Sequence, residues 1–276
     1  MGDLDGLGYR DTTAVLVGCS TGIGEATLRV LNALGARVHA VSRNQPDVEC
    51  EAFHRIDLTD LDRVEATAAT LQGIGPIDHV FACSGVPPTR ARRETLLVNY
   101  IGLRHLVDSV VPAMADGGNI CVSGSNTAYG WEKQVPNLLE LVAIDDPHEA
   151  LAWCDDHAEL NPEGFPAYVF SKQALITWVT HRAPSLGQER GIRLNCAAPG
   201  LTETAMPNEI AEKAGTRALV DAYPNPLFGR ITTPEEQAWP MVLLNSPRNT
   251  GVTGAVLFAD QGVAGGLMTG ALQFLA

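Results

Sequence analysis

The chain has 276 residues, 45% of them hydrophobic and 18% charged, so it can bury a large core in one or two domains. Its 19 basic and 32 acidic side chains give a formal net charge of −13, which argues against binding to nucleic acid or to an anionic membrane.

Hydropathy and cysteine usage narrow the class further. No apolar run reaches the roughly 18 residues that would suggest a membrane span, and the first ten residues lack the pattern of a signal peptide. The six cysteines show neither CxxC spacing nor ligand-like spacing with histidine. We therefore expect reduced thiols, a soluble cytoplasmic protein and no metal site.

Short β-rich runs alternate with helical patterns through most of the chain. Between the first two runs, apolar residues recur at helical spacing from Ile23 to Leu34 and stop at Gly35. Near-continuous apolar strands that alternate with helices predict a doubly wound α/β fold, with a parallel sheet covered on both faces. The expected strands are 12–18, 36–42, 77–82, 119–124, 192–197 and 254–259.

Two capping patterns predict helix starts outside the glycine-rich region. The first is Thr59-x-x-Asp62, and the second is Thr233-Pro234-x-Glu236, with proline at the first helical position. Pro184 falls in the helix expected to begin near Tyr168, and we expect it to kink that helix or end it early.

Residues 131–166 interrupt the alternation. They contain nine acidic residues and one lysine, so they carry −8 of the net charge of −13. Asp146, Pro147 and Glu149 form a helix-start pattern within them. We expect a helical insertion within a single domain spanning 1–276. Its acidic surface is most simply a solvated face, with a partner-binding surface as the alternative.

The first strand runs into a glycine-rich turn, GCSTGIGE, with Gly18, Gly22 and Gly24. Glycines between a strand and a helix let the backbone approach a pyrophosphate, which the helix N-terminus also attracts. The turn therefore predicts nucleotide binding. The second strand ends in Ser42 and Arg43 instead of an acidic residue. An arginine there suits a ribose 2′-phosphate, so NADP(H) is favoured and NAD(H) stays possible.

Tyr168 and Lys172 are four residues apart in an apolar segment, which places them on one face of a helix. A lysine ammonium near a phenol favours the phenolate and lowers the phenol's pKa from its usual value near 10. The pair is therefore a candidate for general acid–base chemistry.

Further motifs stand in order along the chain: after the glycine turn come Asp57, Cys83-Ser84-Gly85, Asn99 and Ser125, and after Tyr168-x3-Lys172 come Asn195 and Pro199-Gly200. Together they resemble the short-chain dehydrogenase/reductase family over nearly the whole chain. Within this family, three segments resemble the bacterial 3α-hydroxysteroid dehydrogenase/carbonyl reductase group: GCSTGIGEATLRVL, LLVNYIG and RLNCAAPGLTET. Coniferyl-alcohol dehydrogenases are similar. The resemblance implies a Rossmann-type fold and hydride transfer between a nicotinamide cofactor and a ketone or secondary alcohol.

The resemblance also implies a role for each catalytic candidate. Tyr168 is the general acid or base, Ser125 holds the substrate oxygen, and Lys172 bonds the nicotinamide ribose. Asn99 holds a water that connects Lys172 to solvent. Ser123, two residues before Ser125, is kept as an alternative to it. The implied cofactor contacts are Gly18, Ser20, Gly22, Ile23, Gly24, Ser42, Arg43, Asp57, Leu58, Cys83, Ser84, Gly85, Tyr168, Lys172, Pro199, Gly200, Thr202 and Thr204.

Residues 205–232 correspond to the segment that closes over the substrate in this family. Five apolar or aromatic side chains are expected to line an apolar pocket: Met206, Tyr223, Leu227, Phe228 and Trp131. A steroid, terpenoid or aryl substrate fits such a pocket, although these side chains equally suit simple packing of the lid.

Relatives in the family form tetramers through helices that include the one carrying the tyrosine. The segment 131–166 lies beside that surface, so we expect a homo-oligomer, with a dimer favoured. Two alternatives from other classes are a catalytically idle nucleotide-sensing regulator and a scaffold that uses the acidic segment as a partner site.

Overall fold

The computed structural model describes residues 4–273, whose strands form one seven-stranded parallel sheet in the order β3-β2-β1-β4-β5-β6-β7. Six strands fall on the six expected runs, and the short edge strand β3 was not predicted. The strands are β1 (Thr13–Val17), β2 (Arg37–Ser42), β3 (Ala52–Arg55), β4 (Ile77–Ala82), β5 (Met114–Ser123), β6 (Arg193–Pro199) and β7 (Val256–Ala259).

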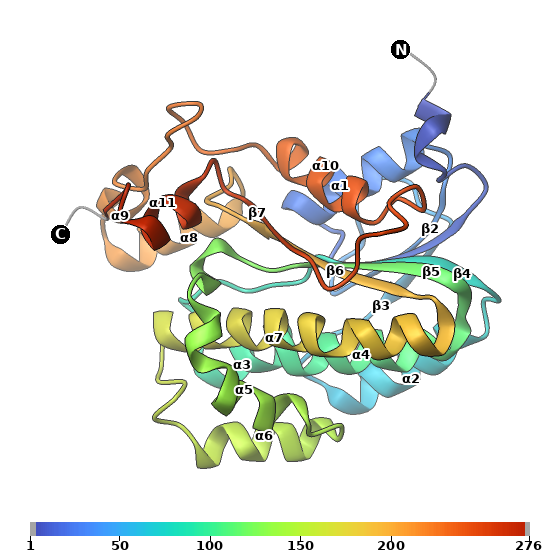
Figure 1. Ribbon diagram of the computed structural model, residues 1–276, viewed down its shortest axis with the longest axis horizontal. Helices are drawn as coiled ribbons and strands as arrows, with labels where there is room; N and C mark the ends of the chain where they lie inside the picture. The colour runs from blue at the N-terminus through green and yellow to red at the C-terminus, as the bar shows by residue number, and fades with distance from the viewer. Residues whose placement is uncertain (1–3, 274–276) are drawn as a thin grey trace.

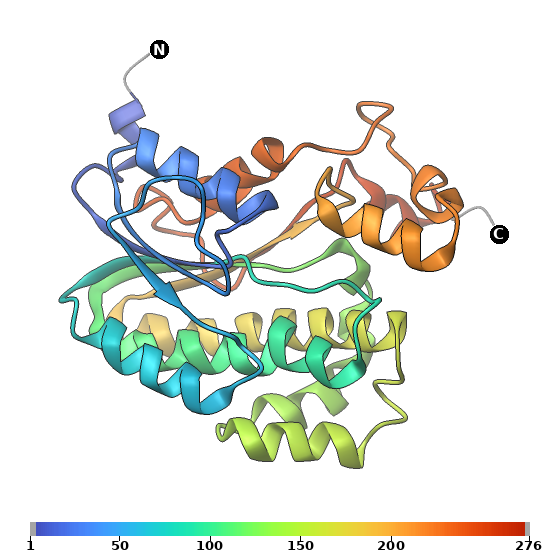
Figure 2. The same cartoon turned by 180° about the vertical axis from the view of Figure 1, so that it is seen from behind.

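Helices cover both faces of the sheet, as the alternating pattern predicted (Figures 1 and 2). One face carries α1 (Gly22–Ala33) and α10 (Pro234–Leu244), which pack against each other. The other face carries α2 (Leu61–Gln72), α4 (Gly102–Val110) and α7 (Phe165–Arg190). The fold is therefore the expected doubly wound, Rossmann-type α/β domain.

Alternating side chains of β1 supply both hydrophobic cores. Val15 and Val17 belong to the core beneath α2, α4 and α7, whereas Ala14 and Leu16 belong to the core beneath α1 and α10. All four side chains are at most 1% exposed. This two-sided burial explains why β1 reads as a continuous apolar run and not as an alternating one.

Shorter helices connect these elements. Segment 131–166 is helical, as expected, and its helices α5 and α6 form a further layer outside α7 (Figure 1). The short helices are η1 (Leu4–Leu7), α3 (Arg92–Leu96), the π-helical turn η2 (Leu97–Ile101), η3 (Val111–Ala113), η4 (Asn126–Ala128), η5 (Trp131–Gln134), α5 (Val135–Val142), α6 (Pro147–Asp156), α8 (Ala205–Ala214), α9 (Ala218–Asp221) and α11 (Val263–Thr269).

The predicted helix starts at the two proline-containing sites are confirmed. Thr233 and Glu236 form a reciprocal capping box at the start of α10, and Asp146 accepts the backbone N–H groups of His148 and Glu149 at the start of α6. The start of α2 is one residue later than predicted. Asp60 is its N-cap, because the Thr59 hydroxyl instead donates to Asp57, at 2.7 Å.

Of the two outcomes expected at Pro184, the early end of the helix is wrong, since α7 continues to Arg190, and the kink stays a prediction. Ala183 and Leu186, on either side of the proline, are fully buried. Their packing holds the last turns in place even though proline in a helix interior costs about 3 kcal/mol.

The strand order reverses between β1 and β4, which creates a crevice at the carboxyl ends of these strands. Gly18 follows β1 and Cys83 follows β4 at this edge. Within residues 4–273, no helix is both long enough and apolar enough to cross a membrane.

Candidate active site

The glycine-rich turn forms a cradle in which backbone groups approach closely. A Cβ on Gly18 would lie 2.4 Å from the Ser84 backbone nitrogen, and a Cβ on Gly24 would lie 1.9 Å from the Gly18 carbonyl oxygen. Gly18 and Gly22 have φ angles of +80° and +61°, which favour glycine. No side chain caps α1 at Thr21, so its first N–H groups are available to an anion. This cradle fits a dinucleotide pyrophosphate.

The segment Cys83-Ser84-Gly85 lies between the cradle and the catalytic candidates. The Cys83 N–H donates to the Val17 carbonyl at 2.7 Å, which ties the segment to β1. At its other end, a Cβ on Gly85 would lie 3.5 Å from Lys172 Nζ and 3.6 Å from Asn99 Oδ1. The structure therefore brings Cys83-Ser84-Gly85 together with Asn99 and Lys172, which are distant in the chain, as expected for one site.

Asn99 is completely buried in the π-helical turn η2. Its Oδ1 accepts the Val86 N–H at 2.7 Å, and its Nδ2 donates to the Val86 carbonyl at 3.2 Å and to Ser171 Oγ at 3.3 Å. Asn99 therefore fixes the chain that follows Gly85, which lines the candidate active site. π-Helical turns are rare and occur frequently at functional sites.

Ser125, Tyr168 and Lys172 converge at the end of β5. Tyr168 lies in the first turn of α7, is 8% exposed and shares a hydrogen bond with the Ser125 hydroxyl. Ser125 Oγ accepts hydrogen bonds from Thr127 N at 3.2 Å and from Thr127 Oγ1 at 2.9 Å. Because Ser125 accepts both of these bonds, its own proton can point to the Tyr168 oxygen, with which it shares the remaining hydrogen bond.

Lys172 is 3% exposed and donates to the Ser123 carbonyl oxygen at 3.1 Å. Burial lowers the pKa of Lys172 to about 8. Burial also raises the pKa of Tyr168, while the hydrogen bond from Ser125 acts in the opposite direction. The sequence predicted a lowered phenol pKa from the lysine charge, whereas burial has the larger effect in the protein alone.

A cavity of about 440 Å³ is lined by Arg43 and Asp57, two residues that were expected to contact the adenosine part of the cofactor. Arg43 is exposed at its rim, and the positive charge of Arg43 helps to lower the pKa of Asp57 after the larger effect of the hydrogen bond from Thr59 N. Ser42 is buried, and its hydroxyl donates to the Asn44 carbonyl. Arg93 also lines this cavity. Arg93 was not predicted, because it lies in the short helix α3 after β4 and belongs to no local motif.

The remaining expected cofactor contacts lie at the same edge of the sheet. Thr204 caps α8 and packs near Gly22, since a Cβ on Gly22 would lie 3.1 Å from Thr204 Cγ2. Thr202 donates to the Gly200 carbonyl at 3.0 Å, directly after Pro199 ends β6. The other three are neighbours in sequence of residues that line the crevice. Ser20 and Ile23 belong to the glycine-rich turn and to α1, and Leu58 follows Asp57.

Residues 205–232 fold into α8, α9 and an extended return (Figure 2). Leu227 is 67% exposed and Phe228 is 49% exposed, so neither is enclosed in the expected pocket. The guanidinium of Arg230 instead covers the Phe228 ring, 5.1 Å from its centroid. Trp131 packs against the core beneath α7. Met206 and Tyr223 are half-buried.

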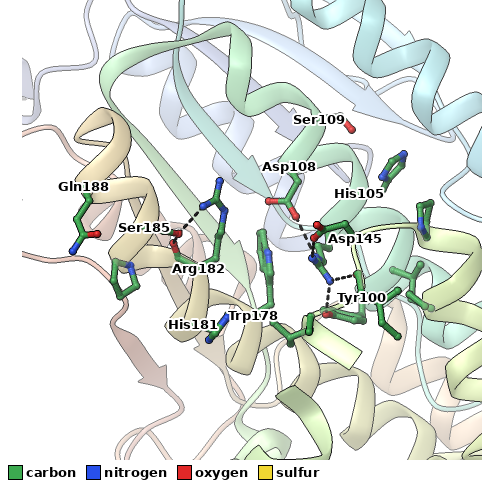
Figure 3. Close-up of a pocket in the computed structure, with 18 residues that line it drawn as sticks. Tyr100, His105, Asp108, Ser109, Asp145, Trp178, His181, Arg182, Ser185 and Gln188 are labelled. Atoms are coloured by element: carbon green, nitrogen blue, oxygen red, sulfur yellow. Dashed lines mark hydrogen bonds and ion pairs between the residues drawn. The ribbon is translucent and has the colours of Figure 1, made fainter. Parts of the chain in front are cut away.

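A larger cavity, of about 830 Å³, lies away from these residues between α4, α7 and the loop that joins α5 to α6 (Figure 3). Arg104 crosses it and binds Asp108 and Asp145 at 3.1 and 3.0 Å. Ser125, Tyr168 and Lys172 are not among its lining residues. Size alone therefore does not identify the active site in this protein.

Two further residues that were not predicted, Asn126 and Asp260, lie beside Tyr223. Asn126, directly after Ser125, donates from its side-chain amide to the Tyr223 hydroxyl and to Asp260. Asn126 and Asp260 are 5% and 2% exposed. They are 134 residues apart, so no local pattern could have paired them.

This crevice, with a glycine cradle and a serine, a tyrosine and a lysine at one strand end, defines a nicotinamide-dependent oxidoreductase of alcohols and ketones. Two family models match the chain, "short chain dehydrogenase" over residues 12–136 and "Enoyl-(Acyl carrier protein) reductase" over residues 156–264. The chain belongs to the short-chain dehydrogenase family.

Individual relatives agree with this assignment. A coniferyl-alcohol dehydrogenase of Pseudomonas sp. (strain HR199 / DSM 7063) is 32% identical, covering 76% of this chain and 80% of its own. A 3-alpha-hydroxysteroid dehydrogenase/carbonyl reductase of Comamonas testosteroni is 31% identical, and the match covers 90% of this chain and 95% of that protein. The 3-alpha-hydroxysteroid dehydrogenase from Pseudomonas sp. B-0831, solved with NADH, matches with a TM-score of 0.80 at 25% identity over 95% of this chain and all of that chain.

Proposed function

We propose that this protein transfers a hydride between NADP(H) and an apolar ketone or secondary alcohol, with Tyr168 as the general acid or base. The observation that carries the proposal is the convergence of Tyr168, Ser125 and Lys172 beside the glycine cradle. A scaffold or a nucleotide sensor has no need for a buried phenol that shares a hydrogen bond with a serine hydroxyl.

Each polar group at this site has a distinct task in the proposal. A bound nicotinamide supplies the hydride for reduction and accepts it in oxidation. Ser125 turns its hydroxyl proton from the Tyr168 oxygen to the substrate oxygen when substrate binds, and Tyr168 gives that oxygen a proton during reduction or takes one during oxidation. Lys172 holds the nicotinamide ribose as an ammonium and lowers the phenol's pKa once its charge is fixed there. Asn99 fixes the Val86 backbone beside them.

The preference for NADP(H) rests on two arginines at the adenosine end. Arg43 and Arg93 both line the 440 Å³ cavity, and guanidinium groups bind phosphate by charge and by paired hydrogen bonds. Asp57 and Glu94 also line this cavity, so a 2′-phosphate has to lie on its arginine side. NAD(H) remains the alternative, since the relative from Pseudomonas sp. B-0831 was solved with NADH.

The substrate class rests on the lid and on the relatives. The names of the two relatives describe a coniferyl-alcohol dehydrogenase and a 3-alpha-hydroxysteroid dehydrogenase/carbonyl reductase. An aryl, steroid or terpenoid skeleton is largely apolar, and the segment 205–232 follows β6 at the carboxyl ends of the strands. We propose that Met206 and the ring of Tyr223 form the apolar wall that faces such a substrate.

The assembly we propose is a homodimer in the cytoplasm. Segment 131–166 packs on α7, so α5 and α6 stand beside the surface through which relatives in the family assemble (Figure 1). All six cysteines are free thiols, which suits a reducing compartment. Sedimentation analysis of the purified chain decides between a dimer and a tetramer.

Tyr168→Phe tests the proposed chemistry, because it removes the phenolic proton and keeps the ring. With NADPH and an aryl ketone, kcat is expected to fall by about 10²- to 10⁴-fold, the usual contribution of a general acid. NADPH affinity is expected to stay unchanged. A variant that turns over at the wild-type rate would exclude Tyr168 as the acid, and a wild-type protein that binds NADPH yet turns over no carbonyl would favour the nucleotide-sensor alternative.

Fluorescence titration with NADPH and NADH tests the cofactor preference. Arg43→Ala is expected to weaken NADPH binding by about tenfold, the effect of a lost charge-assisted hydrogen bond. NADH binding is expected to be unaffected. If wild-type protein binds NADH more tightly and Arg43→Ala changes neither affinity, Arg43 is a surface residue and the cofactor is NAD(H).

A further inference from the structure

The hydroxyl of Tyr223 lies where the ends of three strands meet. It accepts a hydrogen bond from Asn126, which follows β5, and it lies near the buried carboxylate of Asp260, which follows β7. A Cβ on Gly200, after β6, would lie 2.9 Å from this hydroxyl. A tyrosine from the lid therefore reaches past Gly200 into the strand ends, and only glycine at position 200 leaves the space it needs.

Asp260 is fixed independently of the lid. Its carboxylate accepts the N–H groups of Gly262 at 3.0 Å and of Ala264 at 2.6 Å, at the start of α11. Asn126 donates to the same carboxylate at 3.2 Å. Asp260 thus orients the Asn126 amide, and the amide meets the Tyr223 hydroxyl in a defined direction.

The next residue, Gln261, holds the rest of the lid's return. Its side-chain oxygen accepts the Phe228 N–H at 3.0 Å, and its side-chain nitrogen donates to the Arg230 carbonyl at 2.8 Å. Gln261 has a φ angle of +61°, an uncommon conformation for a residue with a side chain. A strained backbone that is held by several hydrogen bonds is typical of functional segments.

We propose that Tyr223 is a positioning residue: it anchors the lid 205–232 on Asn126 and Asp260, and through Asn126 it fixes the backbone that carries Ser125. The proposal rests on the proposed function in that Ser125 is taken to hold the substrate oxygen. The lid and the hydroxyl of Ser125 are then coupled, because Asn126 is the residue next to Ser125. Substrate is held only when the lid is in place.

Limited trypsin digestion tests the anchor without any need for turnover. Lys213 and Arg217 are exposed cleavage sites within the lid. Tyr223→Phe is expected to speed cleavage at these sites by about fivefold, the factor that corresponds to one lost hydrogen bond. Tyr9→Phe is the matched control, since it removes a buried tyrosine hydroxyl that donates to the Val242 carbonyl on α10. Cleavage of the lid at the wild-type rate in Tyr223→Phe overturns the proposal.

Steady-state kinetics with NADPH and acetophenone test the coupling to Ser125. Tyr223→Phe is expected to lower kcat by about fivefold for the same lost hydrogen bond, with NADPH affinity unchanged. The fold-decrease in kcat of the double variant Asn126→Ala/Tyr223→Phe is expected to be smaller than the product of the fold-decreases of the two single variants. The reason is that both substitutions break the same hydrogen-bond network. Tyr9→Phe is expected to lower the melting temperature and leave kcat unchanged. Fully multiplicative effects, or an unchanged kcat in Tyr223→Phe, would reject the coupling.

These experiments separate the two proposals. If the wild-type protein reduces no carbonyl compound, the proposed function fails, and the digestion result still decides whether Tyr223 anchors the lid. If the protein is an active reductase and digestion of Tyr223→Phe matches that of wild type, the positioning role of Tyr223 fails and the proposed function stands.

Discussion

The two sides of the candidate active site are built differently. On the cofactor side, Gly18, Gly24 and Ser84 bring backbone atoms so close that a single added Cβ would overlap them. On the proposed substrate side, the segment 205–232 pairs through its backbone near Thr232, its middle is held by side chains, and Leu227 and Phe228 stand exposed. One side is fixed by main-chain geometry, and the other by contacts that point substitutions can alter.

This difference matches what each side has to recognise. A pyrophosphate is the same in every dinucleotide, so a rigid arrangement of glycines and N–H groups serves it. Substrates differ among relatives, and a segment whose position depends on side-chain hydrogen bonds can change without disturbing the sheet. The outer end of the lid illustrates this, because Glu209 on α8 pairs with Thr89 and with Arg90, the latter at 3.0 Å.

The largest predicted effect on cofactor affinity follows from breaking the main-chain side. Gly18→Ala adds a Cβ 2.4 Å from the Ser84 nitrogen at a φ angle of +80°. We expect cofactor affinity to fall by about 100-fold, because a displacement of the turn that costs about 3 kcal/mol is of this size. Titration with NADPH measures it. Gly117→Ala is the control, with a φ angle of +78° and open space around the added Cβ. Equal affinity losses in both variants would show that backbone strain, and not contact with Ser84, is responsible.

A smaller effect on NADPH affinity is expected from a change in pH, and it acts on the cofactor side of the candidate active site. Burial lowers the pKa of Lys172 to about 8, so the ammonium that we propose to hold the ribose is lost as pH rises through this value. NADPH affinity is expected to fall by up to about tenfold per pH unit above 8, since one proton is then taken up on binding. Isothermal titration calorimetry in buffers of different ionisation enthalpy measures that proton uptake. Lys172→Met is expected to bind weakly at every pH, and a wild-type affinity that stays flat from pH 7 to 10 would contradict the assignment.

The smallest effect is expected at the exposed end of the lid. Arg90 and Glu209 are 42% and 34% exposed, so their pairing contributes only about 0.5 kcal/mol. Glu209→Gln is expected to change kcat/KM for an aryl ketone about twofold, and 1 M NaCl is expected to remove the difference from wild type. Glu212→Gln, one turn away on the same helix, is the control. A tenfold effect would mean that this contact, and not Tyr223, is the main attachment of the lid.

Much of the fold follows from local patterns in the sequence. Six strands, the helix α1 and the capping box at Thr233 each depend on residues that are close in the chain. The edge strand β3 escaped prediction because its four residues are at best half-buried and include His54 and Arg55. Pro184 misled the prediction for α7, because the burial of Leu186 outweighs the local preference of proline.

The site was predictable only where residues act within a motif. Tyr168 and Lys172 share a helix, and the three glycines share a turn, so spacing pointed to them. Tyr223 and Asn126 are 97 residues apart, and their contact depends on how α9 returns to the sheet. The raised pKa of Tyr168 was equally hidden, because it depends on burial by residues from several elements.

The helical segment 131–166 leaves the domain just after Ser125 and returns just before Tyr168, two residues that share a hydrogen bond. Its far end is fastened by Arg92, which donates to the Cys154 carbonyl and to Asn161. Closing a loop between two fixed ends costs only about 0.6 kcal/mol more for each doubling of its length. The segment nevertheless cannot simply be exchanged for a shorter turn, because Leu138, Leu141 and Cys154 are fully buried in the core beneath α7 and their removal would expose that core.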